Sequence, residues 1–312
     1  MIGIQQIASY VPSGHIDNLG RLGEFGVDEK FLREKIGVET VSRRADNEDT
    51  AALCQKAFAA LIAKMNIDPA KVDCVVVCTQ NPEKSGLPHT SAVLHGLLNL
   101  PTRCACWDIS LGCTGYVHGL AIVHSFMTAQ GLRNGLLFTA DPYSKIVDPA
   151  DRNTAMIFGD GATVTLLSSA HGETPVLVPV ASRFHTEGDR CGALENRGGK
   201  LHMDGRAVFN FSATVAPRQI DDLLKSSSLT RDDIDLYLFH QGSKYIVDAI
   251  RQRLGLSEKR VPIDLKNQGN LVSSSIPHML QNYVSRPEIK RVLMSGFGVG
   301  LAAATCLLER RA

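Results

Sequence analysis

Three residues of this sequence are of the types that support nucleophilic chemistry, and they lie far apart along the chain. Cys113 stands in the segment LGCTG, His240 in LYLFHQGS and Asn270 in NQGNLVSS. A thiolate is a strong nucleophile, and a histidine near it can act as a base, an acid or a hydrogen-bond donor. Each residue also has an ordinary structural interpretation: a packed core thiol, a histidine that caps a helix, and an asparagine that caps a turn.

The residues around Cys113 favour the chemical interpretation. WDIS (107–110) is typical of a strand end, and YVHGLAIVHSFM (116–127) is typical of a helix rich in small residues. The thiol therefore stands at an expected helix start, where free N–H groups and the helix dipole favour a thiolate. Gly112 and Gly115 would let a substrate approach the backbone closely.

Segments of the first half of the chain recur in similar form and in the same order in the second half. The pairs are offset by roughly 140 to 160 residues and comprise 71–82 with 233–244, 134–144 with 290–300, and 159–169 with 300–310. Such a repeat predicts a duplicated structural unit. We therefore expect two similar halves: residues 1–170, with the cysteine, and residues 171–312, with the histidine and the asparagine.

Continuous apolar runs alternate with segments of helical spacing. CVVV at 74–77 and LYLF at 236–239 follow the helical patterns at 51–68 and 216–233. This alternation predicts a mostly parallel sheet covered by helices on both faces. Ligands bind beyond the strand ends of such sheets, and His240 directly follows LYLF.

The composition is that of a globular chain without a strong charge bias. Of 312 residues, 44% are hydrophobic and 21% are charged, and the net charge is +1, which argues against a nucleic-acid partner. The N-terminus lacks the charged start and apolar core of a secretory signal. The uncharged run 109–132 contains two histidines and several polar residues, which favours a buried helix over a membrane span. The eight cysteines have no regular spacing, so we expect reduced thiols in a cytoplasmic protein.

Several other functional classes lack the motifs they need. CAC at 104–106 has no second pair at metal-ligand spacing, so we expect no metal site. SGFGVG (295–300) does not have the spacing of a dinucleotide loop and instead predicts a glycine-rich turn between two strands, near the thiol. No G-x-S-x-G elbow occurs, which weighs against a serine hydrolase.

Five motifs occur in a particular order along the chain: DISLGCTGY, DPADRNTAMIFGDGAT, HQGS, NQGNLVSSSIP and GFGVG. In this order, and over essentially the full length, the chain resembles β-ketoacyl-ACP synthase III and its relatives in the thiolase superfamily. The resemblance implies an α/β fold, a five-layered αβαβα sandwich of two similar halves. It also implies a homodimer.

The resemblance further assigns roles to the candidate residues. Cys113 would take an acyl group from acyl-CoA, and malonyl-ACP would then enter and lose carbon dioxide. His240 and Asn270 would donate hydrogen bonds to the thioester oxygen as it gains enolate charge. Backbone N–H groups of Cys113 and of the Ser295–Gly296 turn would hold the oxygen of the attacked carbonyl. Acyl-CoA and acyl carrier protein enter as substrates, and no cofactor is implied.

Several residues fall on substrate-binding positions of the family, with departures from its pattern. Phe31 stands where the family often has a tryptophan that stacks on the CoA adenine, and Arg152 matches the other stacking residue. Ser243 replaces the asparagine of the usual HQAN, and Tyr245 replaces a basic residue shortly beyond it. Leu87 replaces a pocket-lining phenylalanine that the dimer partner contributes. These changes suggest a starter other than plain acetyl.

Two alternatives to condensation remain open from the sequence. A relative of the same fold could move the acyl group from the cysteine to an alcohol or amine without decarboxylation. A non-catalytic thiolase-fold subunit could instead support a partner enzyme, although retention of Cys113, His240 and Asn270 together argues against that role.

Overall fold

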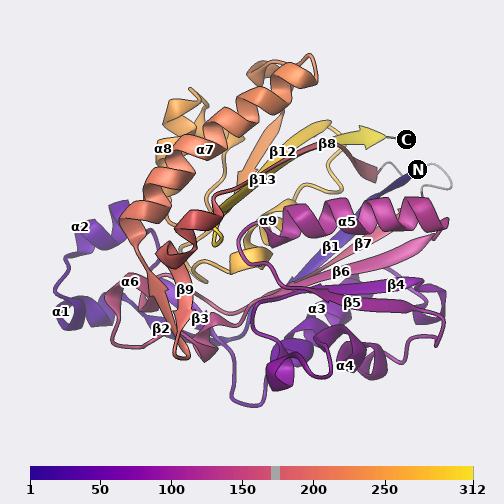
Figure 1. Cartoon of the computed structure of the whole chain (residues 1–312), viewed down its shortest axis with the longest axis horizontal. Helices are drawn as coiled ribbons and strands as arrows, with labels where there is room; N and C mark the ends of the chain where they lie inside the picture. Colours follow the sequence, from indigo (N-terminus) through magenta and orange to yellow (C-terminus); the bar gives the residue numbers. More distant parts are fainter. Residues whose placement is uncertain (170–175, 312) are drawn as a thin grey trace.

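The computed structural model describes residues 1–169 and 176–311, and nine of the strands within them form one sheet (Figure 1). The order across the sheet is β11-β12-β13-β8-β1-β7-β6-β4-β5. The bounds of these strands are β1 (Ile2–Tyr10), β4 (Cys74–Cys78), β5 (Ala105–Ile109), β6 (Asn134–Ala140), β7 (Ala162–Ser169), β8 (Val176–Thr186), β11 (Leu236–Phe239), β12 (Arg291–Gly298) and β13 (Ala302–Arg311).

The strand order repeats between the two halves of the sheet. The first half contributes the run β1-β7-β6-β4, and the second half contributes the equivalent run β8-β13-β12-β11. In both runs the strand that comes first in the sequence lies next to the last strand of its half. The halves meet where β1 pairs with β8 through Ile4 and Leu177. The expected boundary between residues 170 and 171 lies outside the described residues and stays a prediction.

The expectation of a mostly parallel sheet is wrong. Among the described strands, the pairs β4–β5, β4–β6 and β11–β12 are parallel. The other five pairs are antiparallel, and each involves β7, β13 or β8. A short turn from β12 to β13 and a longer connection from β6 to β7, which contains a short helix at residues 152–155, each bring the chain back antiparallel to the strand it has just left. Apolar runs identify buried strands but do not carry their direction.

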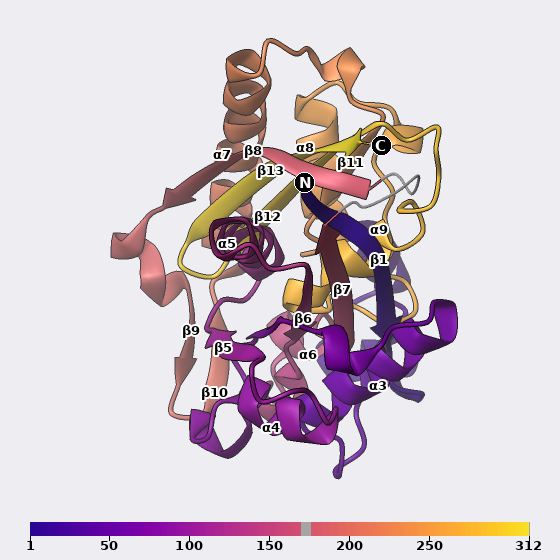
Figure 2. The same ribbon diagram turned by 90° about the vertical axis from the view of Figure 1, so that its right-hand side faces the viewer.

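The two halves of the sheet form the two β layers of the five-layered sandwich that the resemblance implies. Helices lie between these two layers and on the outer face of each (Figure 2). The outer helices of the first half pack on β1, β7 and β5. In the second half one outer helix packs on β12 and β13 and the other packs on that helix, and the central helices contact strands of both halves. Their bounds are α3 (Thr50–Lys64) and α4 (Thr90–Leu97) for the first layer, α5 (Gly115–Gln130) and α9 (Ser275–Leu280) for the centre, and α7 (Gly205–Ser226) and α8 (Lys244–Arg253) for the second outer layer. Smaller elements are α1 (Leu22–Phe25), α2 (Glu29–Phe31), α6 (Arg152–Ala155), the antiparallel pair of β2 (Gly14–Asp17) and β3 (Thr40–Arg43), and the hairpin of β9 (Leu194–Arg197) and β10 (Lys200–Met203).

The position of α5 explains the uncharged run at 109–132. The helix lies between the two halves of the sheet and buries Tyr116, Val117, Leu120 and Val123 against both. A charge there would lose its hydration without gaining a partner. Among the described residues, no helix is both long and apolar enough to cross a membrane.

The helix α7 begins earlier than the sequence pattern predicts. It starts at Gly205, where the side chain of Asp204 accepts hydrogen bonds from the next backbone N–H groups. Pro217 lies inside the helix and has no N–H to donate to the carbonyl four residues back. That carbonyl, of Ala213, accepts a hydrogen bond from Arg253 at 3.1 Å instead. This hydrogen bond from α8 helps the helix α7 continue beyond Pro217. The first turns of α7 reach the cavity of the candidate active site.

Candidate active site

Cys113 lies in the tight turn that leads into the central helix α5. The N–H of Gly115 donates to the carbonyl of Gly112 at 2.7 Å, and the helix begins at Gly115, as the sequence predicts. A side chain at Gly115 would collide with the sulfur of Cys78 in β4. The turn therefore packs directly on the sheet, and the thiol of Cys113 is 5% exposed.

The environment of the thiol opposes its ionisation. Burial raises the pKa of Cys113 to about 12, although the N–H groups of Val299 and of Cys113 itself act in the other direction. Asp141 contributes a further increase in this pKa. Burial therefore opposes the ionisation expected at a helix start, because the loss of hydration outweighs the two backbone hydrogen bonds.

This pKa predicts the pH dependence of alkylation. Because the thiolate is the reacting species, the rate at which iodoacetamide modifies Cys113 should rise about tenfold per pH unit between about pH 7 and pH 10. Peptide mass spectrometry would measure it, with the exposed Cys191 as an internal reference for reagent consumption. A rate that levels off near neutral pH would show that the helix start governs ionisation after all.

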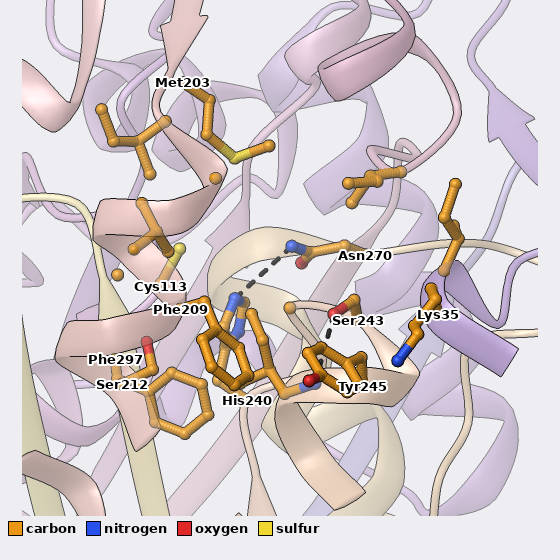
Figure 3. Close-up of a pocket in the computed structure, with 18 of the residues that line it drawn as sticks. Lys35, Cys113, Met203, Phe209, Ser212, His240, Ser243, Tyr245, Asn270 and Phe297 are labelled. Carbon is orange, nitrogen blue, oxygen red and sulfur yellow. Dashed lines mark hydrogen bonds between the residues drawn. The ribbon is translucent and has the colours of Figure 1, made fainter. Parts of the chain in front are cut away.

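His240 and Asn270 come together from two separate turns of the second half. His240 follows β11, and the residue that caps α8 is Ser243, so the histidine is not a helix cap. The Oδ1 of Asn270 accepts hydrogen bonds from the N–H of Val272 at 2.8 Å and from the hydroxyl of Ser275 at 3.2 Å. These bonds direct Nδ2 of Asn270 towards Nε2 of His240, 3.5 Å away (Figure 3). Asn270 thus makes the local turn bond of its ordinary structural interpretation, and its side-chain amide also lies beside the histidine.

The spacing and charge of this pair suit hydrogen-bond donation. A separation of 3.5 Å is at the limit of a hydrogen bond, so N–H groups on both side chains can point to one oxygen between them. Burial lowers the pKa of His240 to about 3, and the backbone of Val272 only partly opposes this. The imidazole is therefore neutral at neutral pH, and the free enzyme holds no thiolate–imidazolium pair.

A cavity of about 390 Å³ joins the three residues. Cys113, His240 and Asn270 all line it, and Figure 3 shows them among the lining side chains. Apolar residues make up much of the remaining wall, from the β9–β10 hairpin, α7 and the end of β12: Leu194, Met203, Val208, Phe209 and Phe297. The cavity can hold an acyl chain in contact with a thiol and two donors.

The predicted substrate-binding residues divide into two groups. Phe31 and Ser243 line the cavity. Arg152, an exposed residue at the start of α6, and Leu87, which is 84% exposed, do not line it. The proposed contribution of Leu87 concerns the cavity of a dimer partner and stays a prediction.

The backbone N–H groups that hydrogen-bond to the sulfur are those of Cys113 and Val299. The pair predicted to hold the oxygen of the attacked carbonyl, Cys113 with Ser295 or Gly296, shares only Cys113 with these two donors. Ser295 and Gly296 lie within β12, where they pair with Thr305 and Ala304 of β13, and neither lines the cavity. The glycine-rich turn is confirmed, but the first four residues of the expected turn, 295–298, belong to β12.

Among the residues of the cavity wall that the sequence did not indicate, one group lies on a single helix, α7. Phe209 stacks on Tyr245 with ring centroids 4.9 Å apart and an interplanar angle of 15°. Nζ of Lys35 lies 3.7 Å from the centroid of the Tyr245 ring. The positions Gly205, Val208, Phe209 and Ser212, all in contact with the cavity, have the spacing of one helix face, which is the signal that could have found them.

Comparisons with known proteins agree with this geometry. The model of the 3-oxoacyl-[acyl-carrier-protein] synthase III family matches residues 107–188, which contain the cysteine, and the model of its C-terminal region matches residues 224–310, which contain the histidine and the asparagine. The β-ketoacyl-[acyl-carrier-protein] synthase III of Coxiella burnetii (strain RSA 493) is 31% identical over 320 residues, 98% of each chain. The chain belongs to the 3-oxoacyl-[acyl-carrier-protein] synthase III family. It is therefore a condensing enzyme of the transferase class, in the thiolase superfamily, and its reaction is a Claisen condensation of fatty-acid biosynthesis.

Further relatives support the same assignment. The β-ketoacyl-[acyl-carrier-protein] synthase III of Lactococcus lactis subsp. cremoris (strain SK11) is 28% identical over 98% of each chain. A crystal structure of a 3-oxoacyl-(acyl-carrier-protein) synthase III superposes with a TM-score of 0.90 at 29% identity, covering 99% of each chain. The enzyme of Thermus thermophilus gives a TM-score of 0.89 at 28% identity, covering 98% of each chain. OleA of Xanthomonas campestris, at 14% identity, shares the fold.

Proposed function

We propose that this synthase condenses an acyl-CoA starter with malonyl-ACP through an acyl group held on Cys113. The observation that supports this most is the convergence of Nδ2 of Asn270 and Nε2 of His240, 3.5 Å apart, in the cavity that the thiol also lines. Two neutral donors aimed at one point suit an oxygen that gains negative charge during the reaction.

In the first step the sulfur of Cys113 attacks the thioester carbonyl of the starter. The N–H groups of Cys113 and Val299 would stabilise the resulting oxyanion, each by about 3 kcal/mol. The bond from carbon to the CoA sulfur then breaks, and the thiol proton leaves with CoA. With a pKa of about 12 the thiol carries this proton in the free enzyme, so proton loss accompanies bond formation.

In the second step malonyl-ACP replaces CoA and loses its carboxylate as carbon dioxide. The electron pair of the broken bond forms an enolate, whose oxygen accepts hydrogen bonds from His240 and Asn270. Its carbon attacks the acyl carbonyl on Cys113, the carbon–sulfur bond breaks, and the released thiolate takes a proton from solvent. The product is a 3-oxoacyl-ACP. The low pKa of His240 keeps the imidazole a neutral donor throughout.

The remaining proposals concern assembly and location. We propose that the protein is a cytoplasmic homodimer and uses no cofactor. Acyl-CoA and the acyl carrier protein would bind as substrates and enter past Phe31 and Ser243. Arg152 would bind the adenine end of CoA. The protruding side chain of Leu87, 84% exposed, fits a contact with a second copy. The net charge of +1 supports the absence of a nucleic-acid partner.

Mass spectrometry of the products tests the proposed reaction. Acyl-CoA with malonyl-ACP should give a 3-oxoacyl-ACP two carbons longer than the starter, with one carbon dioxide released per product. A panel of acyl-CoA donors, followed by intact-protein mass, would identify the starter from the mass added to the chain. If no malonyl donor releases carbon dioxide while an alcohol or amine becomes acylated, condensation is excluded and simple acyl transfer replaces it.

A further inference from the structure

The wall of the cavity contains a buried hydroxyl group without a partner. Ser212 of α7 lines the cavity and is fully buried. Its Oγ has no hydrogen-bond partner among residues 1–169 and 176–311. A helical serine often satisfies its hydroxyl with a carbonyl one turn earlier, but Ser212 does not.

The neighbours of Ser212 on the cavity face of α7 are apolar. Ser212 follows Val208 and Phe209 by one helical turn, and all three line the cavity. Phe209 and Ser212 are labelled in Figure 3. A buried hydroxyl without a hydrogen bond is unfavourable, and an alanine would continue the apolar face without that cost. A buried water would need two to four polar partners, which Val208 and Phe209 do not supply.

We propose that Ser212 forms a hydrogen bond to an oxygen of the thioester that occupies the cavity and so contributes to the choice of substrate. This inference rests on the proposed function, because the cavity is taken as the place where the thioester binds. Two parts of the thioester carry such an oxygen: a hydroxyl or keto group on the acyl chain, and an amide of the pantetheine arm. Either would satisfy the hydroxyl that the free protein leaves unpaired.

Two acyl-CoA substrates that differ by one hydroxyl group distinguish the two sources of the oxygen. The rate of acylation of Cys113 by butyryl-CoA and by 3-hydroxybutyryl-CoA would be measured by intact-protein mass for the wild type and for Ser212→Ala. If the acyl chain supplies the oxygen, Ser212→Ala slows acylation by 3-hydroxybutyryl-CoA about three- to tenfold and leaves butyryl-CoA unchanged. If the pantetheine arm supplies it, both donors slow by the same factor. Unchanged rates with both donors overturn the proposal.

A matched variant controls for the loss of a buried hydroxyl as such. Ser91 in α4 is also fully buried with an unpaired Oγ within the described part of the chain, and it does not line the cavity. Ser91→Ala should leave both acylation rates unchanged. The melting temperature of Ser212→Ala should equal or exceed that of the wild type, because no protein partner is lost. A clear decrease in melting temperature together with equal acylation rates would assign Ser212 a purely structural role.

Binding without reaction separates this inference from the proposed function. Calorimetric titration with the same two thioesters would compare Cys113→Ala with the double variant Cys113→Ala/Ser212→Ala, and it reports the contact independently of acylation. A larger Kd in the double variant, for one thioester or for both, supports the contact even if wild-type Cys113 accepts no acyl group. An equal Kd for both esters contradicts the contact even if acylation and condensation proceed as proposed.

Discussion

Cys113→Ala should abolish the acyl adduct and lower the rate of condensation by at least about 10⁴-fold. The variant lacks the sulfur that holds the acyl group between the two steps, and no other thiol in the described part of the chain lines the cavity. Decarboxylation of malonyl-ACP should continue, because its donors, His240 and Asn270, are held by their own turns. Carbon dioxide release and intact-protein mass, measured on one sample, check both expectations.

The reciprocal variant separates the two steps. His240→Ala should still form the acyl adduct, because a histidine with a pKa of about 3 is too weak a base to take the thiol proton, which leaves with CoA. Its decarboxylation and condensation should fall about 10²- to 10³-fold with the loss of one donor to the enolate oxygen. If His240→Ala instead fails to form the adduct, the histidine serves as the base for the thiol, and the division of roles proposed above is wrong.

Gly298→Ala should lower the rate of acylation about 10²-fold, because it displaces the sulfur. An added methyl group at Gly298 would lie 2.7 Å from Sγ of Cys113 and 2.8 Å from its Cβ. Gly298 also has a φ of +151°, a conformation that side chains rarely adopt. The free energy of unfolding should fall by about 1–3 kcal/mol for the same reasons. Rates of adduct formation and denaturant unfolding measure the two effects.

An exposed glycine provides the control for this substitution. A methyl group at Gly188 would have no neighbour within 4 Å among the described residues, and Gly188 is not among the glycines with positive φ. Gly188→Ala should therefore leave both the acylation rate and the stability close to those of the wild type. If Gly298→Ala behaves like Gly188→Ala, the turn after β12 has room to move, and the close approach to Cys113 does not position the sulfur.

Local patterns in the sequence were sufficient to locate the central elements and the reactive residues. CVVV and LYLF became β4 and β11, and the uncharged run after LGCTG became α5. Apolar runs and glycine turns act over a few residues, so they are visible without a structure. The five motifs, taken in order, also led to the family, the five layers and the three residues that share the cavity.

Long-range packing decided three other features: the direction of the strands, the backbone N–H groups that hydrogen-bond to the sulfur, and the protonation of the Cys113 thiol. The pairing of β12 with β13 turns the N–H of Val299, and not that of Ser295 or Gly296, towards the sulfur. The cavity wall on α7 was missed because the expected helical pattern began at residue 216, whereas α7 begins at Gly205. The pKa of Cys113 depends on how much water the folded chain removes from the sulfur. That desolvation comes from segments far apart in the sequence, so no pattern near residue 113 contains it.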